Sequence, residues 1–141
     1  MPGVGTWDAS KLKNTVGPYT LKGLAEGDFL DIAQHEVSFV MGIGATGEGV
    51  RSKTNNRSGS FTYRLMQTSE DNQKMETIRA LDSLANAGII PISVSDISGF
   101  DEHIAPECWI IKPPDVTYGR DAGMREWIFD TADISMFCGG N

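Results

Sequence analysis

Two alternating segments on either side of a glycine-rich stretch constrain the fold of this chain most strongly. The stretch runs from Gly42 to Gly59, and both residues 35–43 before it and residues 60–67 after it alternate between apolar and polar side chains. A period of two indicates a β-strand that buries one face and exposes the other. Two such strands joined by a polar connection predict an antiparallel pair, with a long loop over residues 44–59 between them.

The same glycines also match two phosphate-binding motifs. Gly42, Gly44 and Gly47 spell the G-x-G-x-x-G of dinucleotide-binding folds, and residues 47–54 come within one residue of a P-loop. Both motifs need a helix to begin directly after them, because its N-terminal amides hold the anion. The residues that follow here have poor helix propensity and lead into a strand. A nucleotide-dependent enzyme is therefore a minor alternative, which replacement of Lys53 by alanine would test.

One helix is expected over about residues 70–87. Apolar residues recur there at a spacing of three to four and form one stripe, which we expect to pack on the core: Met75, Ile78, Leu81, Leu84 and Ala85. Thr68-Ser69 supply an N-cap for this helix, and Thr68 with Asp71 fits a capping box. Gly88 is a natural stop at its end.

The remainder of the chain reads as short strands separated by turns. Sixteen glycines and six prolines favour a turn-rich, β-rich fold. Further strands are expected at residues 89–94, 108–112 and 125–137, the last with a bulge near residues 132–133 and with Trp127 as a core anchor. We predict a mainly β protein, an antiparallel β-barrel or sandwich with one flanking α-helix. Its 141 residues suit a single domain, placed at residues 17–141 after an N-terminal arm at residues 1–16.

Charge and hydropathy limit the partners that this chain can take. The net charge is −7 and no basic patch is present, which argues against tight binding to a phosphate backbone, although an acidic wall repels a nucleic acid and lets it slide. No apolar run is long enough to span a bilayer, and the first residues lack the regions of a signal peptide. We expect a soluble protein that does not bind membranes, with Cys108 and Cys138 as reduced thiols.

No group of residues forms a convincing catalytic constellation. Asp101 and His103 lie at alternate positions and could hold a metal, but the surrounding acidic residues (Asp96, Glu102 and Glu107) match no calcium loop and fit a solvated turn better. His35 and His103 have no identifiable nucleophile or orienting partner. We therefore expect no catalytic, cofactor-binding or metal site.

Several short motifs carry a resemblance to a known family. In order they are Gly42 to Gly49, Ser58-Gly59-Ser60 at the opening of a strand, Leu65-Met66-Gln67-Thr68-Ser69 running into a helix at Asn72, Pro91 with Asp96 and Gly99, and Glu126-Trp127-Ile128-Phe129. Their order and spacing resemble the tail tube proteins of contractile-tailed bacteriophages, from about residue 25 to the end of the chain. The N-terminal arm is not covered by this resemblance.

The resemblance implies a structural protein of the virion that is not an enzyme and needs no cofactor. In that family six subunits form a ring, and rings stack into a hollow tube that is assembled in the host cytoplasm. The tube lies inside the tail sheath protein, surrounds a tape-measure protein and conducts DNA without sequence-specific binding. A secreted effector-delivery tube of the same fold is a close alternative, and a small-ligand-binding β-barrel is an alternative of another class.

The glycine-rich connection supplies most of the candidates for contacts between subunits or rings. Long structureless loops in compact domains are usually functional or disordered. With Trp7 from the N-terminal arm, the candidate contact residues are Thr46, Glu48, Val50, Arg51, Lys53, Asn55 and Arg57. We expect the loop to be mobile in the free subunit and ordered when rings stack.

Overall fold

The computed structural model describes residues 4–97 and 99–139 of the chain. In chain order its elements are the 3-10 turn η1 (Ala9–Lys11), β1 (Leu12–Val16), β2 (Tyr19–Thr20), β3 (Leu30–Gln34), β4 (Phe39–Ile43), β5 (Gly49–Lys53), β6 (Gly59–Met66), the helix α1 (Asp71–Ala85), β7 (Ile90–Asp96), β8 (Glu102–Ile110), β9 (Met124–Thr131) and β10 (Ser135–Phe137). The prediction of a mainly β fold with one helix is confirmed.

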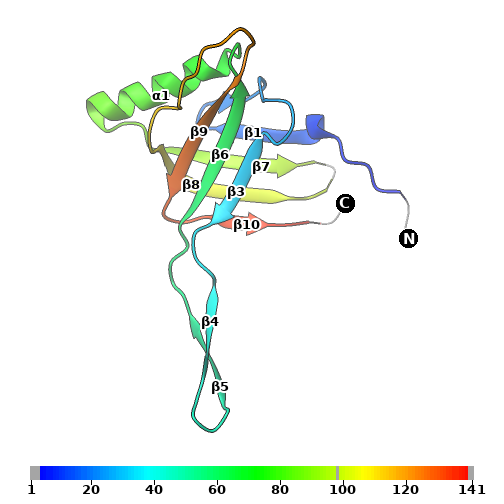
Figure 1. Cartoon of the computed structure of the whole chain (residues 1–141), viewed down its shortest axis with the longest axis vertical. Helices are drawn as coiled ribbons and strands as arrows, with labels where there is room; N and C mark the ends of the chain where they lie inside the picture. The colour runs from blue at the N-terminus through cyan, green and yellow to red at the C-terminus, as the bar shows by residue number, and fades with distance from the viewer. Residues whose placement is uncertain (1–3, 98, 140–141) are drawn as a thin grey trace.

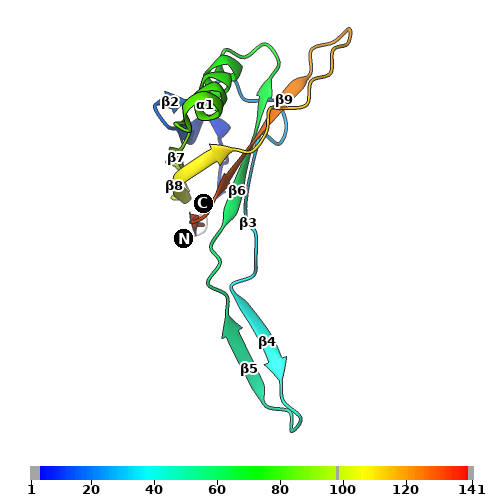
Figure 2. The same ribbon diagram turned by 90° about the vertical axis from the view of Figure 1, so that its left-hand side faces the viewer.

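One antiparallel sheet folds over on itself to form two layers. Its strand order is β2-β1-β7-β8-β9-β6-β3, and β10 pairs with β8. The layer of β3, β6 and β9 crosses the layer of β1, β7, β8 and β10 (Figure 1). Seen from the side, α1 and the β7–β8 layer lie on the same side of β6 and β9 (Figure 2). The core lies between these parts, and only β4 and β5 stand outside it as a separate two-stranded sheet.

The alternation in β6 places its side chains as the sequence predicts. Phe61, Tyr63 and Leu65 are fully buried in the core. Trp127 of β9 is 2% exposed, and its indole N–H donates a hydrogen bond to the Asn72 side-chain oxygen at 3.0 Å. Its predicted role as a core anchor is confirmed.

The helix forms where it was predicted, but less of its apolar stripe is buried. Met75 and Ile78 lie in the core, whereas Leu81 and Leu84 are exposed. The second half of α1 therefore extends beyond the layers that it covers. The helix ends at Ala85, and its C-cap Asn86 takes the left-handed conformation, two residues before the stop predicted at Gly88.

The start of the helix also differs from the predicted capping box. The backbone N–H of Asp71 donates to the Ser69 hydroxyl at 3.1 Å, with no contribution from Thr68. The Asp71 carboxylate instead accepts the backbone N–H groups of Lys22 at 2.7 Å and Gly23 at 2.8 Å. This acidic residue ties the helix to the segment that follows β2.

Three predicted boundaries need correction. The loop predicted over residues 44–59 contains β5, whose residues pair with β4. The N-terminal arm predicted over residues 1–16 ends earlier, because Leu12–Val16 pair with β7 inside the main sheet. The single strand predicted over residues 125–137 is two strands, since Ile134 turns into the core between β9 and β10.

Candidate assembly surfaces

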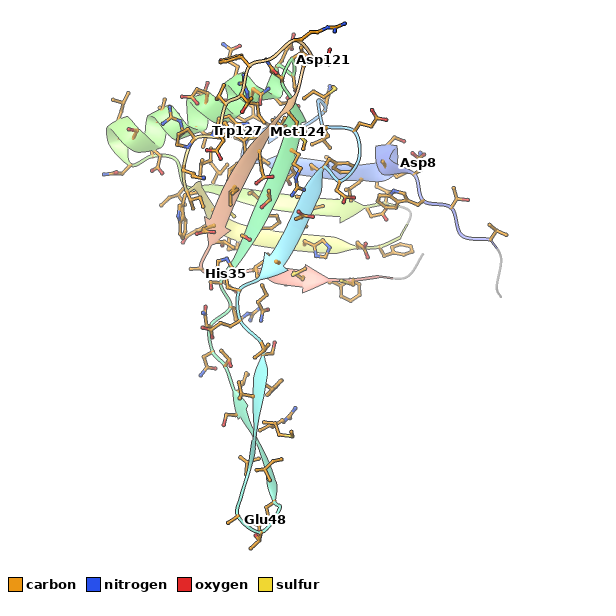
Figure 3. All side chains as sticks on the ribbon, viewed as in Figure 1. Asp8, His35, Glu48, Asp121, Met124 and Trp127 are labelled. Carbon is orange, nitrogen blue, oxygen red and sulfur yellow. The ribbon has the colours of Figure 1, made fainter. Side chains whose placement is uncertain are left out.

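A projecting hairpin, made of β4, β5 and the turn at residues 44–48, is the most distinctive surface. It extends from the end of the molecule where β3 stops and β6 begins, with His35 near its base and Glu48 near its tip (Figure 3). Every residue of β4 and β5 is exposed. The strands are held together by their own ladder, which aligns Phe39 with Lys53 and Ile43 with Gly49.

The register of the hairpin gives its two faces different chemistry. Phe39 lies opposite Lys53 and Met41 lies opposite Arg51, so these residues share a face with Ile43. The Arg51 guanidinium stacks over the Phe39 ring at 4.2 Å. We call this set (Phe39, Met41, Ile43, Arg51 and Lys53) the apolar-cationic face. The opposite face presents Val40, Val50 and Ser52.

The apolar side chains of the hairpin have no place in the core of their own subunit. Met41 is 72% exposed and Ile43 is 68% exposed. An isolated two-stranded hairpin is only marginally stable in water, and contiguous exposed apolar surface marks an interaction site. The hairpin therefore has the features of an interaction surface.

Polar contacts define the tip and the base of the hairpin. At the tip the Thr46 hydroxyl donates to the Glu48 carboxylate at 2.6 Å, and Gly47 has a positive φ of 90°. At the base the His35 N–H donates to the Ser58 carbonyl at 2.9 Å. The Arg57 side chain forms an ion pair with Asp133 at 3.3 Å, which joins the base to the β9–β10 connection.

The predicted contact residues fall into four places. Thr46 and Glu48 form the turn, and Val50, Arg51 and Lys53 lie on β5. Asn55 and Arg57 lie at the base, whereas Trp7 lies away from the hairpin, at a cleft between the layers. The structure therefore brings all of them except Trp7 onto one projection.

Sequence reasoning missed the apolar half of this surface. Phe39, Met41 and Ile43 belong to the alternating segment before the glycines, and alternation was taken to mean a face turned toward the subunit's own core. The segment is a strand as predicted, but its apolar face is exposed. The available signal was its neighbour β5, which is polar and cationic and so cannot be the partner of a buried strand.

The outer face of the β3-β6-β9 layer is mainly polar, and most of its charged side chains are acidic. Arg64 lies at its centre and donates to Asp31 at 2.7 Å and to Glu126 at 3.1 Å. The hydrogen bond that Arg64 donates to Asp31, together with the negative charges of Asp31 and Glu126, raises the pKa of Arg64 above its ordinary value. Asp130 lies on the same face, opposite Ser60. Three carboxylates with one guanidinium leave this face negative.

The β3-β6-β9 layer has two open edges. Phe29 accepts a backbone hydrogen bond from Arg64 of β6, and His35 donates one to Ser58 just before β6. In an antiparallel strand, alternate residues direct their backbone N–H and C=O groups to opposite sides. Leu30, Ile32 and Gln34 therefore direct their backbone N–H and C=O groups away from β6, where the described chain supplies no strand. At the other edge β9 pairs with β8 only through residues 129–131. The first half of β9 is paired with β6 on one side, but on this side no described strand pairs with it.

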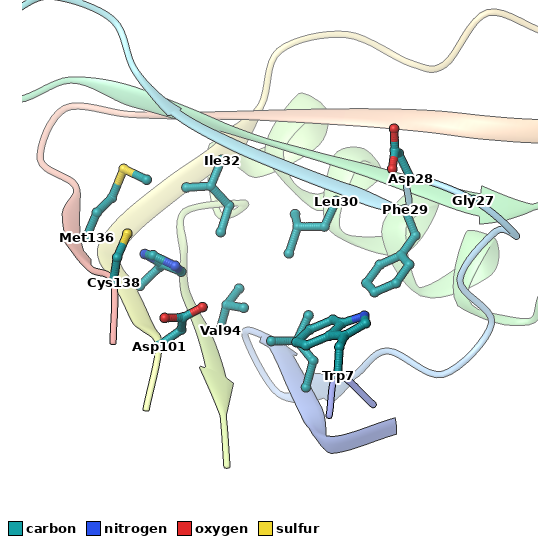
Figure 4. A pocket seen from close by; sticks show the side chains of 12 residues that line it. Trp7, Gly27, Asp28, Phe29, Leu30, Ile32, Val94, Asp101, Met136 and Cys138 are labelled. Carbon is teal, nitrogen blue, oxygen red and sulfur yellow. The ribbon is translucent and has the colours of Figure 1, made fainter. Parts of the chain in front are cut away.

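A cavity of about 390 Å³, the interlayer cleft, opens between β3 and the other layer (Figure 4). Both layers contribute apolar side chains to its lining, which include Leu12, Phe29, Leu30, Ile32, Val94 and Met136. Trp7, Asp28, Asp101, His103 and Cys138 also border it. His103 is 8% exposed, and its Nδ1 is buried with no hydrogen-bond partner in the described part of the chain.

The acidic cluster predicted as a solvated turn is divided between surface and interior. Asp96 and His103 are buried, whereas Glu102 and Glu107 are exposed. Asp101 accepts a hydrogen bond from the Gly139 N–H at 2.6 Å. Within residues 4–97 and 99–139 no three His, Cys, Asp or Glu side chains are grouped so that they could hold a metal ion. None of the described helices is long and apolar enough to cross a membrane.

Comparison with known proteins gives both a family and a fold. The family model described as the bacteriophage PhiTE tail tube protein matches residues 13–139. Structural protein ORF10 of Pseudomonas phage KPP10 is 23% identical over 125 residues, which cover 87% of this chain and 72% of that protein.

Solved structures agree on the architecture. The cap that terminates the anti-feeding prophage tube has a TM-score of 0.62 at 7% identity, covering 99% of this chain and 95% of its own. A subunit of the sheath-tube complex of an extracellular contractile injection system (PVC) has a TM-score of 0.57 at 12% identity, covering 93% and 90%. At these identities the likeness concerns the fold alone.

The family match extends over most of the chain and confirms the resemblance carried by the sequence motifs. Its members are structural proteins of the virion tail, so the assignment of a structural rather than an enzymatic role is also confirmed. The chain belongs to the phage tail tube family represented by the PhiTE tail tube protein.

Proposed function

We propose that this protein forms rings, six subunits in each, that stack into the hollow tube of a contractile tail. The observation that carries the proposal is the projecting hairpin, whose strands are exposed throughout and carry large apolar side chains. The apolar side chains of such a projection leave water, and its two strands become stable, only when another molecule covers them. Family membership supplies the kind of assembly to which that molecule belongs.

The two ends of the subunit support a head-to-tail arrangement. The hairpin forms one end of the molecule, and the connection between β8 and β9, residues 111–123, lies at the opposite end (Figure 1). A contact between unlike surfaces repeats from copy to copy, and it generates a filament when it does not close. Stacking of rings through the hairpin follows from this geometry.

Ring formation uses the open edges of the β3-β6-β9 layer. An edge strand with unpaired backbone groups is a hazard in a monomer and is satisfied when a neighbour continues the sheet. The free edge of β3 and the unpaired half of β9 lie on opposite sides of β6. Lateral pairing of these two edges would join the layers of neighbouring subunits into one wall.

The polar face of that layer suits the inside of a conduit for DNA. Asp31, Glu126 and Asp130 make the face negative, and a negative wall repels phosphates rather than binding them. We place this face toward the lumen, where the tape-measure protein precedes DNA, and the α1 side toward the tail sheath. A sheath-tube complex among the structural neighbours supports a sheathed tube.

Negative-stain electron microscopy of the purified protein tests the proposal directly. We expect concentration-dependent rings with sixfold symmetry in end views, together with stacked tubes. A protein that remains monomeric at high concentration under every salt condition contradicts the proposal, and rings of another symmetry contradict the hexamer.

An effector-delivery tube is the second candidate. It is favoured by the likeness in fold to subunits of an extracellular contractile injection system, namely its sheath/tube terminator and its sheath-tube complex. Subunits of that kind share the fold, so the subunit alone does not separate the two roles. Genes for a capsid and a DNA-packaging enzyme beside this gene would support the DNA conduit, whereas genes for secreted toxins without a capsid would support effector delivery.

A further inference from the structure

We propose that the apolar-cationic face of the hairpin docks into the interlayer cleft of a second copy of this chain. The proposal rests on the proposed function and specifies which surfaces meet when rings stack. It assigns Phe39, Met41 and Ile43 as the side chains that fill the cleft.

The two surfaces match in their apolar chemistry. The hairpin offers three large apolar side chains from one strand face, each without a core of its own. The cleft is bordered by apolar side chains from both layers and, at about 390 Å³, has the size of a ligand pocket, about 300–1,000 Å³. Burying one surface against the other removes both from water, at about 25 cal/mol for each Å² of apolar area.

The two surfaces also match in charge. Arg51 and Lys53 form no ion pair with any described residue, although both lie beside the apolar row. The cleft is bordered by Asp28 and Asp101 and by no lysine or arginine. Opposite charges that meet at the rim of an apolar contact fix its register and orientation.

One polar atom at the cleft has an unused capacity to form a hydrogen bond within the described chain. His103 Nδ1 is buried and has no hydrogen-bond partner among the described residues, although buried polar groups are almost always paired. A backbone group of an incoming hairpin can pair with this nitrogen, which an apolar small molecule cannot do.

The occupant must come from another copy. The hairpin of the same chain extends away from the body, whereas the cleft opens between the layers beyond the free edge of β3 (Figures 1 and 4). The only strand-to-strand contact of β4 and β5 within the described chain is with each other.

The native thiol at the cleft provides the test. Cys138 is exposed and borders the cleft, whereas Cys108 is buried. Phe39→Cys, Met41→Cys and Ile43→Cys, made one at a time, would place a second thiol on the apolar-cationic face. After assembly, each protein is treated with a copper–phenanthroline oxidant or a short bis-maleimide and run on a denaturing gel. We expect covalent dimers and longer ladders from at least one of these variants.

Matched controls separate docking from chance collision. Val40→Cys and Val50→Cys place the thiol on the opposite face of the same hairpin and should give no ladder. Adding Cys138→Ser to the reactive variant should abolish its ladder while leaving assembly unchanged. Ladders of equal strength from both faces, or ladders that persist without Cys138, would overturn the proposal.

Charge reversal gives a second readout that needs no cysteine. The pair Arg51→Glu with Lys53→Glu, and separately the pair Asp28→Lys with Asp101→Lys, should each raise the concentration needed for assembly about tenfold or more, as loss of a complementary pair does. Combining all four changes should restore assembly at least in part, because each reversed hairpin then meets a reversed cleft. Circular dichroism checks that every variant is folded.

The outcomes distinguish this inference from the function on which it rests. Tubes of wild-type protein without cross-links from the apolar-cationic face, and without rescue by the fourfold variant, leave the tube function standing and reject the docking site. A wild-type protein that forms neither rings nor tubes rejects both.

Discussion

Tyr63 places a phenol hydroxyl in the core, where no described residue pairs with it. Burial raises the pKa of this phenol far above its ordinary value. An unpaired buried hydroxyl costs roughly 1–3 kcal/mol, and the ring packs edge-on against Phe129 in either form. Tyr63→Phe should therefore leave the free energy of unfolding unchanged or raise it by about 1 kcal/mol in urea titrations. A clear loss of stability would mean that the hydroxyl has a partner.

Asp71 acts as a clamp between the start of α1 and the segment after β2. Burial alone would raise the pKa of its carboxyl, but hydrogen bonds from the N–H groups of Gly23 and Lys22, with the charge of Lys74, outweigh burial and lower it. A lowered pKa stabilises the fold above the ordinary value of about 3.9. That contribution is lost as the pH falls through the folded-state pKa.

Replacing this clamp should therefore have a pH-dependent effect. We expect Asp71→Asn to lower the free energy of unfolding by about 1–3 kcal/mol at pH 7, with a smaller difference from wild type below pH 4. Denaturant titrations at several pH values measure this difference. Glu76→Gln is the matched control, since Glu76 pairs only with Arg79 on the helix surface and should cost little.

The two thiols should differ sharply in reactivity. Burial raises the pKa of Cys108 to about 11, whereas Cys138 is exposed at the cleft. Since only the thiolate reacts, a maleimide at pH 7.5 should label Cys138 alone in the folded protein, and both after denaturation. Mass spectrometry of the labelled peptides decides this, and rapid labelling of Cys108 in the native protein would contradict its place in the core.

At the scale of elements, the hairpin should be separable from the body. Ser38 and Thr54 are joined by a backbone hydrogen bond of 2.8 Å, so residues 39–53 can be replaced by a tight Asn-Gly turn between them. We expect the shortened protein to keep its melting temperature within a few degrees, because no residue of β4 or β5 belongs to the core. It should form no stacked tubes in electron micrographs. Normal tubes would remove the hairpin from the assembly contacts.

The sequence predicted the elements better than their surroundings. The alternation of Phe61, Tyr63 and Leu65 predicted both the strand and its buried face, because that strand lies in the centre of the subunit. The same pattern at Phe39 and Met41 predicted the strand but not its exposure. Alternation with a period of two indicates that one face of the strand will be buried. It does not indicate whether the residues that bury this face belong to the same chain. The cleft was out of reach for a related reason, since it needs the relative placement of distant strands.

At the scale of the whole molecule, the proposed assembly gives the two ends of the subunit different roles in stacking. The connection over residues 111–123 forms the end away from the hairpin (Figure 2). An added side chain at Gly119 would meet nothing within 4 Å. Insertion of a small folded domain at Gly119 should therefore leave the subunit folded and able to form rings, yet block the addition of further rings. Microscopy that shows long tubes from this variant would contradict the assignment of the two ends.

In the tube that we propose, the exposed hairpin also affects how accurately a long polymer can grow. Two strands with no core beneath them are only marginally stable until something covers them, so part of the free energy of each docking event is spent on ordering. A copy that docks in the wrong register recovers less of that cost, and it leaves sooner than a copy that docks correctly. Wrongly docked subunits can thus dissociate from the growing end. Only a correctly docked subunit stays bound long enough for the next subunit to bind and stabilise it.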